Sequence, residues 1–157
     1  MKLALYQPDI PQNTGAILRL GACLDIAVHI IEPTGFDISN RTLKRTGLDY
    51  LKHAHITRHV SFDAFEAWRT ENAHRLVLLT TTASTAYTDI TYRTDDILML
   101  GRESAGAPDE VHGRADERVR VPMAEGLRSL NIVTAAAIVL GEALRQTGGF
   151  PETRPSA

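Results

Sequence analysis

Apolar and polar positions along this chain fall into blocks whose spacing changes between strand-like and helix-like. Short apolar runs predict buried strands at residues 2–6, 27–32, 75–81, 96–101 and, more weakly, 118–123. Residues 53–60 alternate between apolar and polar positions and indicate an edge strand. Strands separated by helical segments imply an α/β fold with a parallel sheet that is covered by helices on both faces.

The segments between these runs carry apolar residues at helical spacing. Residues 11–24 predict a first helix, and residues 39–45 a short basic helix. Ser61 is placed to cap a helix that contains Phe62, Phe65 and Trp68. Residues 129–146 predict a long helix rich in Ala and Val, with Ser129 as its cap. In such folds ligands bind at the carboxyl ends of the strands, so the loops after residues 96–101 and 118–123 are the candidate site.

The composition also indicates the number of domains and the cellular compartment. The chain has 157 residues, of which 43% are hydrophobic and 23% charged, as in ordinary globular proteins, and no apolar run reaches transmembrane length. We expect one domain over residues 1–150 and a frayed tail over 151–157. Cys23 is the only cysteine, which excludes a disulfide within the chain and favours the cytoplasm.

The net charge of −2 does not by itself indicate a nucleic-acid binder. Charge is unevenly distributed, however, because Asp49 is the only acid between residues 41 and 59. The bases of this segment are Arg41, Lys44, Arg45, Lys52 and Arg58. They form either an RNA-binding face that contacts phosphates or an ordinary solvated surface.

Three motifs contain candidate chemistry. The first, IPQNTGAILRLGA, places Arg19 about one turn beyond Gly15, where it points toward a ligand or into solvent. The second, LMLGRESAG, ends a strand in Gly101, whose missing side chain lets backbone approach a flat ligand. Glu103 in this loop either orients a substrate hydroxyl or holds the loop. The motif is neither a dinucleotide fingerprint nor a phosphate-binding loop.

The third motif, VPMAEGLRSLNIVTAAAIVLGEALR, opens a helix whose free N–H groups favour an anion, although the helix is equally suited to a core position. The histidines show no metal-ligand spacing, so no metal site is expected.

Taken in register, these blocks resemble the SPOUT superfamily of RNA methyltransferases, and within it the bacterial TrmL-type tRNA 2′-O-methyltransferases, over roughly residues 3–149. The resemblance is carried by IPQNTG with Arg19, IIEPTGF, LKRTGLDYL, LLTT, GRESAG, and VPM followed by RSLN. It implies an α/β knot, in which a parallel sheet flanked by helices ends in a deep C-terminal trefoil knot. Such knots are rare exceptions among protein folds.

The resemblance also implies a reaction and its residues. A methyl group would pass from S-adenosyl-L-methionine to the ribose 2′-hydroxyl of the tRNA wobble nucleotide 34, a cytidine or modified uridine in leucine isoacceptors, leaving S-adenosyl-L-homocysteine. The cofactor-binding residues it implies are Leu79, Gly101, Val121, Ser129, Leu130 and Asn131. The catalytic residues it implies are Arg19, Asn13 and Glu103. No metal is required.

The role of Arg19 has two readings: a strongly perturbed base, or a cation that stabilises the developing alkoxide. Arg102 departs from the family pattern, in which a proline is common, and adds a charge beside the pocket.

The resemblance implies two partners, the tRNA anticodon stem-loop and a second copy of the chain. In the homodimer the first and last helices would pack across a two-fold interface through Gly15, Ala22, Ala135, Ala136 and Val139.

Other functions compete with this one. A 2′-O-methyltransferase of ribosomal RNA is disfavoured because this chain begins at its first predicted strand, without the amino-terminal RNA-binding domain common in such relatives. A catalytically silent RNA-binding protein is disfavoured by the intact Arg19, Glu103 and RSLN. A nicotinamide-binding module lacks its glycine fingerprint.

Overall fold

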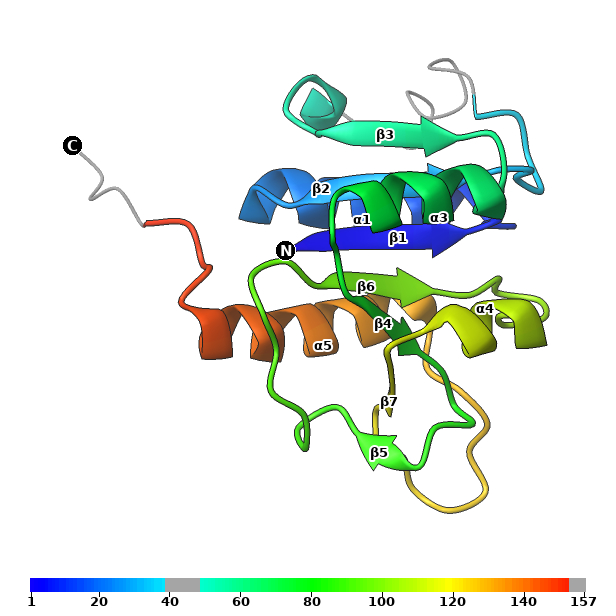
Figure 1. Cartoon of the computed structure of the whole chain (residues 1–157), viewed down its shortest axis with the longest axis vertical. Helices are drawn as coiled ribbons and strands as arrows, with labels where there is room; N and C mark the ends of the chain where they lie inside the picture. Colours follow the sequence, from blue (N-terminus) through cyan, green and yellow to red (C-terminus); the bar gives the residue numbers. More distant parts are fainter. Residues whose placement is uncertain (39–48, 153–157) are drawn as a thin grey trace.

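A parallel sheet of seven strands forms the centre of the described part of the chain, in the order β3-β2-β1-β6-β4-β7-β5 (Figure 1). The computed structural model describes residues 1–38 and 49–152, so the expected basic helix at 39–45 and the end of the tail lie outside the described residues. The strands are β1 Lys2–Tyr6, β2 Ala27–Ile31, β3 Ile56–His59, β4 Leu76–Leu79, β5 Thr85–Ala86, β6 Ile97–Leu100 and β7 Glu117–Arg120.

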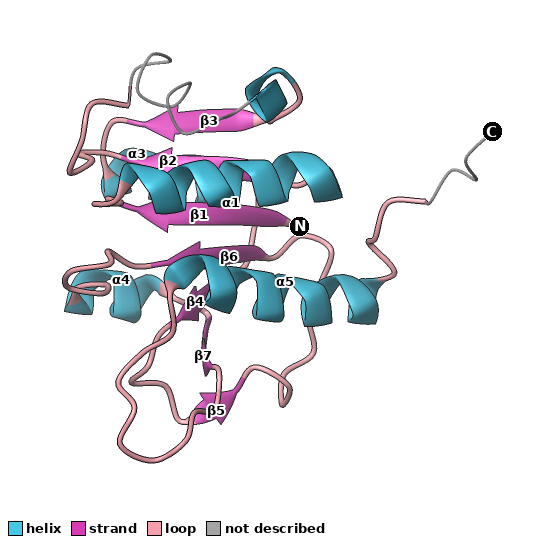
Figure 2. Cartoon of the chain, turned by 180° about the vertical axis from the view of Figure 1, so that it is seen from behind, coloured by secondary structure: helices cyan, strands magenta, loops and turns pink. Residues whose placement is uncertain are grey.

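Helices cover both faces of this sheet. The helices are α1 Pro11–Leu24, α3 Phe62–Glu71, α4 Asp109–Arg114 and α5 Ile132–Thr147, with a 3-10 helix η1 at Asp49–Lys52. Helices α1 and α5 lie side by side on one face (Figure 2), and α3 and α4 cover the other. Among the described helices, none has the length and hydrophobicity needed to cross a bilayer.

Burial on both faces explains why the strands read as continuous apolar runs. Leu3 and Leu5 of β1 pack in the core under α1 and α5, whereas Ala4 and Tyr6 pack in the core under α3. Alternate residues of one strand therefore support opposite layers, as the two-residue period of a strand requires. The predicted parallel sheet is confirmed, and residues 53–60 do form its edge, as β3.

The start of the last helix was predicted wrongly. Helix α5 begins at Ile132 and is capped by Asn131, whose Oδ1 accepts a hydrogen bond of 2.8 Å from the Val133 N–H. Ser129, the expected cap, lies exposed in the preceding loop. Ser61, by contrast, caps α3 as predicted, because its Oγ accepts from the Ala64 N–H at 3.1 Å. The short elements β5 and α4 were not predicted, although the acids Asp109 and Glu110 in the first turn of α4 and Arg114 in its last turn are typical of a helix.

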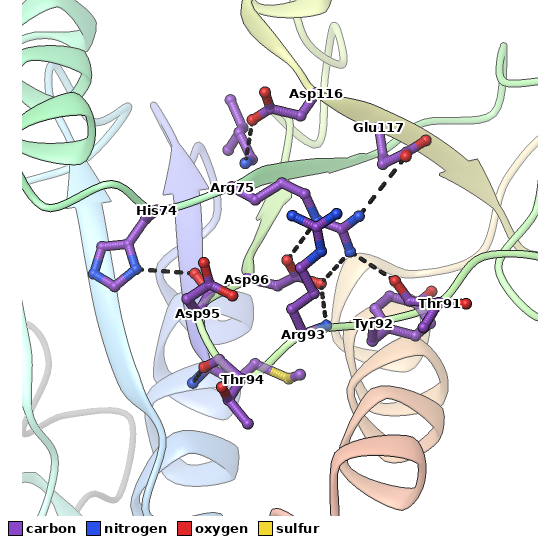
Figure 3. Close-up of polar contacts among 12 residues, drawn as sticks. His74, Arg75, Thr91, Tyr92, Arg93, Thr94, Asp95, Asp96, Asp116 and Glu117 are labelled. Carbon is purple, nitrogen blue, oxygen red and sulfur yellow. Dashed lines mark hydrogen bonds and ion pairs between the residues drawn. The ribbon is translucent and has the colours of Figure 1, made fainter.

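A buried ion pair fixes the amino ends of β4 and β6 (Figure 3). Arg75 donates from Nε and Nη2 to the two carboxylate oxygens of Asp96, both at 2.7 Å, and Asp96 is fully buried. A third donor, the Arg93 N–H, lies 2.9 Å from Asp96 Oδ2. Fully satisfied hydrogen bonding is what makes a buried carboxylate tolerable. The pair thereby anchors the segment just before β6.

The same segment anchors the carboxyl-terminal end of α5. The Gln146 side chain accepts from the Tyr92 N–H at 3.0 Å and donates to the Ile90 carbonyl at 3.2 Å. Tyr92 is itself buried, and its hydroxyl donates to the Tyr87 carbonyl. The orientation of α5, and with it the position of its first turn, therefore depends on a loop at the opposite end of the sheet.

Two histidines form a buried pair between β2 and β3. His29 Nδ1 and His59 Nε2 are 2.9 Å apart, and the rings of Phe65 and Trp68 pack against them. A hydrogen bond between two imidazoles needs one ring nitrogen without a proton. Burial, together with the neighbouring His59, lowers the pKa of His29 to about 4.

We predict that this pair makes the protein less stable in mild acid. Because the pKa of His29 is lower in the folded state than its ordinary 6.5, the unfolded chain takes up the proton first as the pH falls. The stabilisation is present above pH 6.5 and is lost toward pH 4, by up to about 3 kcal/mol. Urea unfolding followed by fluorescence of the single tryptophan, Trp68, measures it. His29→Gln, which cannot titrate, should flatten this pH dependence, and an unchanged slope would contradict the assignment.

Candidate functional site

A cavity of 220 Å³ lies at the carboxyl ends of β4, β6 and β7. Its walls also include the loops that follow β6 and β7 and the first turn of α5. The lining residues are Leu79, Thr80, Thr81, Leu100, Gly101, Arg102, Glu103, Gly106, Ala107, Val119, Arg120, Val121, Met123, Ser129, Leu130, Ile132 and Ala135. This is the edge of the sheet at which the strand order and the glycine-bearing loops predicted a ligand site.

Most of the predicted cofactor residues meet in this cavity. Leu79, Gly101, Val121, Ser129 and Leu130 all line it, although they come from separate segments of the chain. Sequence reasoning missed Thr80, Arg120 and Ala135. Thr80 and Arg120 lie at the carboxyl ends of strands, so the rule that ligands bind at these ends could have predicted them. Ala135 has no distinguishing signal within an Ala-rich helix.

The shape of the loop after β6 requires glycine at position 101. A Cβ atom there would lie 2.5 Å from the Gly106 carbonyl carbon and 2.6 Å from the Ala107 nitrogen. Arg102 and Gly106 exchange backbone hydrogen bonds of 2.9 and 2.8 Å, which close the loop, and Gly106 has a φ of +67°. The missing side chain of Gly101 therefore leaves room for the backbone of Gly106 and Ala107. The loop folded in this way forms a wall of the cavity.

Asp9 holds this loop from the end of β1. Its carboxylate accepts from Arg102 Nη2 at 2.7 Å and from the Ser104 N–H at 3.1 Å. Hydrogen bonds from the Arg102 guanidinium, and then from Ser104, lower the pKa of Asp9 to about 2. Asp9 thus compensates the charge that Arg102 adds beside the pocket. Arg102, which stands where proline is common in the family, is paired with Asp9.

Glu103 joins the three sequence motifs. Its Oε2 accepts from the Asp9 N–H at 2.8 Å, and its Oε1 accepts from Asn13 Nδ2 at 3.3 Å. Asn13 Oδ1 in turn accepts from Asn131 Nδ2 at 3.1 Å. Asn131 is also the cap of α5, so one chain of hydrogen bonds connects the starts of α1 and α5 to the loop after β6. We call Asn13, Glu103 and Asn131 the polar linkage.

The polar linkage includes one predicted cofactor residue. Asn131 is absent from the cavity lining, and its side chain contacts the Val133 N–H and Asn13, so its contact with the cofactor stays a prediction. Asn13 likewise contacts Glu103 instead of lining the cavity. Of the two readings of Glu103, the structure supports holding the loop.

Arg19 stands apart from this group. It is exposed, does not line the cavity, and follows Asn13 by six residues, which is roughly 9 Å along the helix axis. Its guanidinium carbon lies 4.5 Å from the centre of the Tyr50 ring, and its Nη2 lies 3.4 Å from the Tyr50 hydroxyl. Within one chain, Asn13 and Glu103 therefore contact each other, but Arg19 is not brought together with them.

Only part of the expected RNA-binding face can be placed. Lys52 and Arg58 are exposed, and Arg58 forms an ion pair of 2.7 Å with Glu32. Arg41, Lys44 and Arg45 lie outside the described residues. In the described ranges, no group of three His, Cys, Asp or Glu side chains is arranged to hold a metal ion.

Comparison with known proteins relates this geometry to a family. The family model described as the SpoU rRNA Methylase family matches residues 1–141. A tRNA (cytidine(34)-2′-O)-methyltransferase from Beijerinckia indica is 60% identical over 148 residues, which are 94% of this chain and 92% of the relative.

Solved structures agree with this relationship. One, described as giving structural insights into the 2-OH methylation of C/U34 on tRNA, superposes with a TM-score of 0.86 at 38% identity and covers 92% of this chain and 94% of its own. An AdoMet-bound rRNA methyltransferase from Sinorhizobium meliloti superposes with a TM-score of 0.82 at 27% identity. That alignment covers 92% of this chain but 55% of the Sinorhizobium chain.

Proposed function

This chain belongs to the SpoU rRNA Methylase family, and on this premise we propose that it methylates the ribose 2′-hydroxyl of nucleotide 34 in tRNA, using S-adenosylmethionine. The observation that carries the proposal is the cavity at the strand ends, which gathers residues of the LLTT, GRESAG and VPM…RSLN segments in a chain that is 60% identical to a cytidine-34 enzyme. Ribosomal RNA is the second candidate substrate. It is less favoured, because the chain is 38% identical to the C/U34 structure and 27% identical to the rRNA enzyme.

The cavity suits S-adenosylmethionine. Leu79 and Val121 offer aliphatic surface for a flat adenine, and the backbone around Gly101 offers polar groups that can read its edge. Ser129 and Leu130, from the loop before α5, would complete the site. When bound, the cofactor supplies a methyl group already activated by its positive sulfur. The protein then has to hold the cofactor, align the ribose oxygen with the methyl carbon, and assist loss of the hydroxyl proton.

The polar linkage would keep the cavity wall and the start of α1 in fixed relation. Glu103 already accepts two hydrogen bonds from the protein, so we assign it and Asn13 a positioning role. Arg19 is the candidate for contact with the reacting ribose. A guanidinium remains charged in proteins, so we favour stabilisation of the developing alkoxide over proton abstraction.

Since Arg19 does not line the cavity of its own chain, we propose that it serves the cavity of a second copy in a homodimer. Gln12, Ala16, Arg19 and Cys23 form an exposed stripe along α1, and Ala137 is exposed on the adjacent α5. Two helices with small exposed residues, side by side on one face (Figure 2), suit close packing against a symmetric copy.

This stripe replaces part of the interface expected from the sequence. Gly15, Ala136 and Val139 are buried inside the chain, so these three are not available for a subunit contact, whereas Ala135 is half-buried at the cavity wall. The three buried residues lie on the inner side of their helices.

We infer that the anticodon stem-loop of tRNA, in leucine isoacceptors, contacts the basic segment that contains Lys52 and Arg58. Both side chains are exposed, and exposed bases can contact phosphates. Arg41, Lys44 and Arg45 belong to the same proposal on their sequence alone. A tRNA substrate also favours a cytoplasmic location.

We also infer the deep trefoil knot that the family resemblance implies. Strand β7 lies between β4 and β5, although residues 80–84, which connect those two strands, come earlier in the chain. The chain then continues to α5, whose Gln146 bonds to the segment before β6. A later part of the chain inserted between two strands that an earlier part connects is the arrangement that threading would produce.

Filling the cavity from a rigid helix should weaken cofactor binding. Ala135→Leu adds bulk to the wall formed by α5, and we predict that calorimetry detects at least a tenfold loss of affinity for S-adenosylhomocysteine, on the order of the 1–3 kcal/mol that overpacking costs. Ala67→Leu, on the exposed side of α3, is the matched control and should bind normally. Equal binding by both variants would show that the ligand lies elsewhere.

The substrate is tested by mapping the product. Purified protein incubated with tRNA and S-adenosylmethionine carrying a labelled methyl group should place the label on the ribose of nucleotide 34, as mass spectrometry of nuclease digests reports. Ribosomal RNA should remain unlabelled. Label in ribosomal RNA, or at another tRNA position, would replace the proposed substrate.

The dimer is tested on its exposed face. Ala137→Arg introduces two charges into a symmetric interface, and we expect sedimentation at micromolar concentration to show a monomer that no longer methylates tRNA but still binds the cofactor. Ala67→Arg, which adds the same charge to the opposite face of the sheet, should remain dimeric and active. Full activity in a monomeric Ala137→Arg protein would rule the shared site out.

A further inference from the structure

We propose that Tyr50 is a positioning residue for Arg19, which fixes the orientation of the guanidinium while leaving its charge available to the substrate. The inference rests on the role of Arg19 in the proposed methyl transfer. It assigns a function to Tyr50, in the segment between β2 and β3, which the site described so far does not use.

The contact joins two elements that are distant in sequence. Tyr50 belongs to η1, which packs against α1, and its carbonyl accepts from the His53 N–H at 2.9 Å. Arg19 Cζ lies 4.5 Å from the centre of the Tyr50 ring, within the range of a cation–π interaction. The separation of 3.4 Å between Arg19 Nη2 and the Tyr50 hydroxyl is long for a hydrogen bond. The ring face is therefore the main contact.

The partner of Arg19 differs in character from those of the five arginines that form ion pairs in the described residues. Carboxylates pair with Arg58, Arg69, Arg75, Arg102 and Arg145. Among residues 1–38, 50 and 52–152, whose side chains the structure describes, no carboxylate lies within ion-pair distance of Arg19. A carboxylate would neutralise the guanidinium and compete with any incoming anion. A tyrosine ring attracts the cation through its electron-rich face without adding a negative charge.

Such a contact suits a residue that must meet a phosphate or a developing alkoxide. An exposed arginine otherwise samples many rotamers, and these would have to be restricted each time substrate binds. The Tyr50 ring restricts the guanidinium before binding, so the reacting groups start nearer to their productive geometry. The substrate can then displace the weak hydroxyl contact while the ring continues to support the guanidinium.

Two variants separate the ring from the bulk of the side chain. Tyr50→Phe keeps the aromatic face and loses the hydroxyl, whereas Tyr50→Leu keeps an apolar side chain and loses the face. We expect kcat for tRNA methylation within about 3-fold of wild type for Phe and lowered roughly 10-fold for Leu, because the guanidinium is displaced. Cofactor affinity should be unchanged in both. Equal rates for Phe and Leu would overturn the proposal.

A double-mutant cycle tests whether Tyr50 acts through Arg19. In an Arg19→Lys protein, replacing Tyr50 by Leu should lower the remaining rate by less than about 2-fold, because the planar group that the ring positions is already gone. A full 10-fold loss in that background would show that Tyr50 acts independently, and the proposal would be wrong.

The contact can also be observed without catalysis. The NMR signal of the Arg19 Nε–H should show a ring-current shift in the wild-type and Tyr50→Phe proteins and lose it in Tyr50→Leu. Absence of the shift from the wild type would overturn the contact. An Arg19→Ala protein with wild-type turnover would remove both the proposed role of Arg19 and this inference. A slow Arg19→Ala protein beside a fully active Tyr50→Leu protein would overturn the inference alone.

Discussion

The hydrogen bonds that the Glu103 carboxylate accepts are the interactions on which the site depends. It accepts hydrogen bonds from the Asp9 N–H and from Asn13, and Asn13 accepts one from Asn131, the cap of α5. These groups come from three segments of the chain, so the carboxylate fixes the cavity wall against the starts of two helices. Preorganisation of this kind lets a site bind its ligand without reordering the protein.

Polar contacts at the opposite end of the sheet also restrain helix α5. Arg75 and Asp96 fix the segment before β6, and Gln146 ties the last turns of α5 to it (Figure 3 shows the ion pair). Helix α5 is therefore held by polar contacts near both of its ends. Its first turn, which contributes Ile132 and Ala135 to the cavity, has little freedom to move away.

The sequence predicted those parts of the site that depend on local pattern. Pro11 opens α1 as expected, and Leu79, Gly101 and Val121 meet because parallel strands end at one edge of the sheet. The cap of α5 was assigned wrongly, since Ser129 and Asn131 are both good caps and the choice involves Asn13, which is 118 residues away. The contact of Arg19 with Tyr50 likewise depends on the packing of η1 on α1, which no local pattern reveals.

The position of the cofactor relative to the polar linkage tests this account most directly. A crystal structure of the protein with S-adenosylhomocysteine should show the ligand between the loop at residues 101–107 and the first turn of α5. The hydrogen bonds among Asn13, Glu103 and Asn131 should be unchanged. A ligand bound elsewhere, or one that binds in this cavity only after those bonds have broken, would contradict the claim that the linkage preorganises the site.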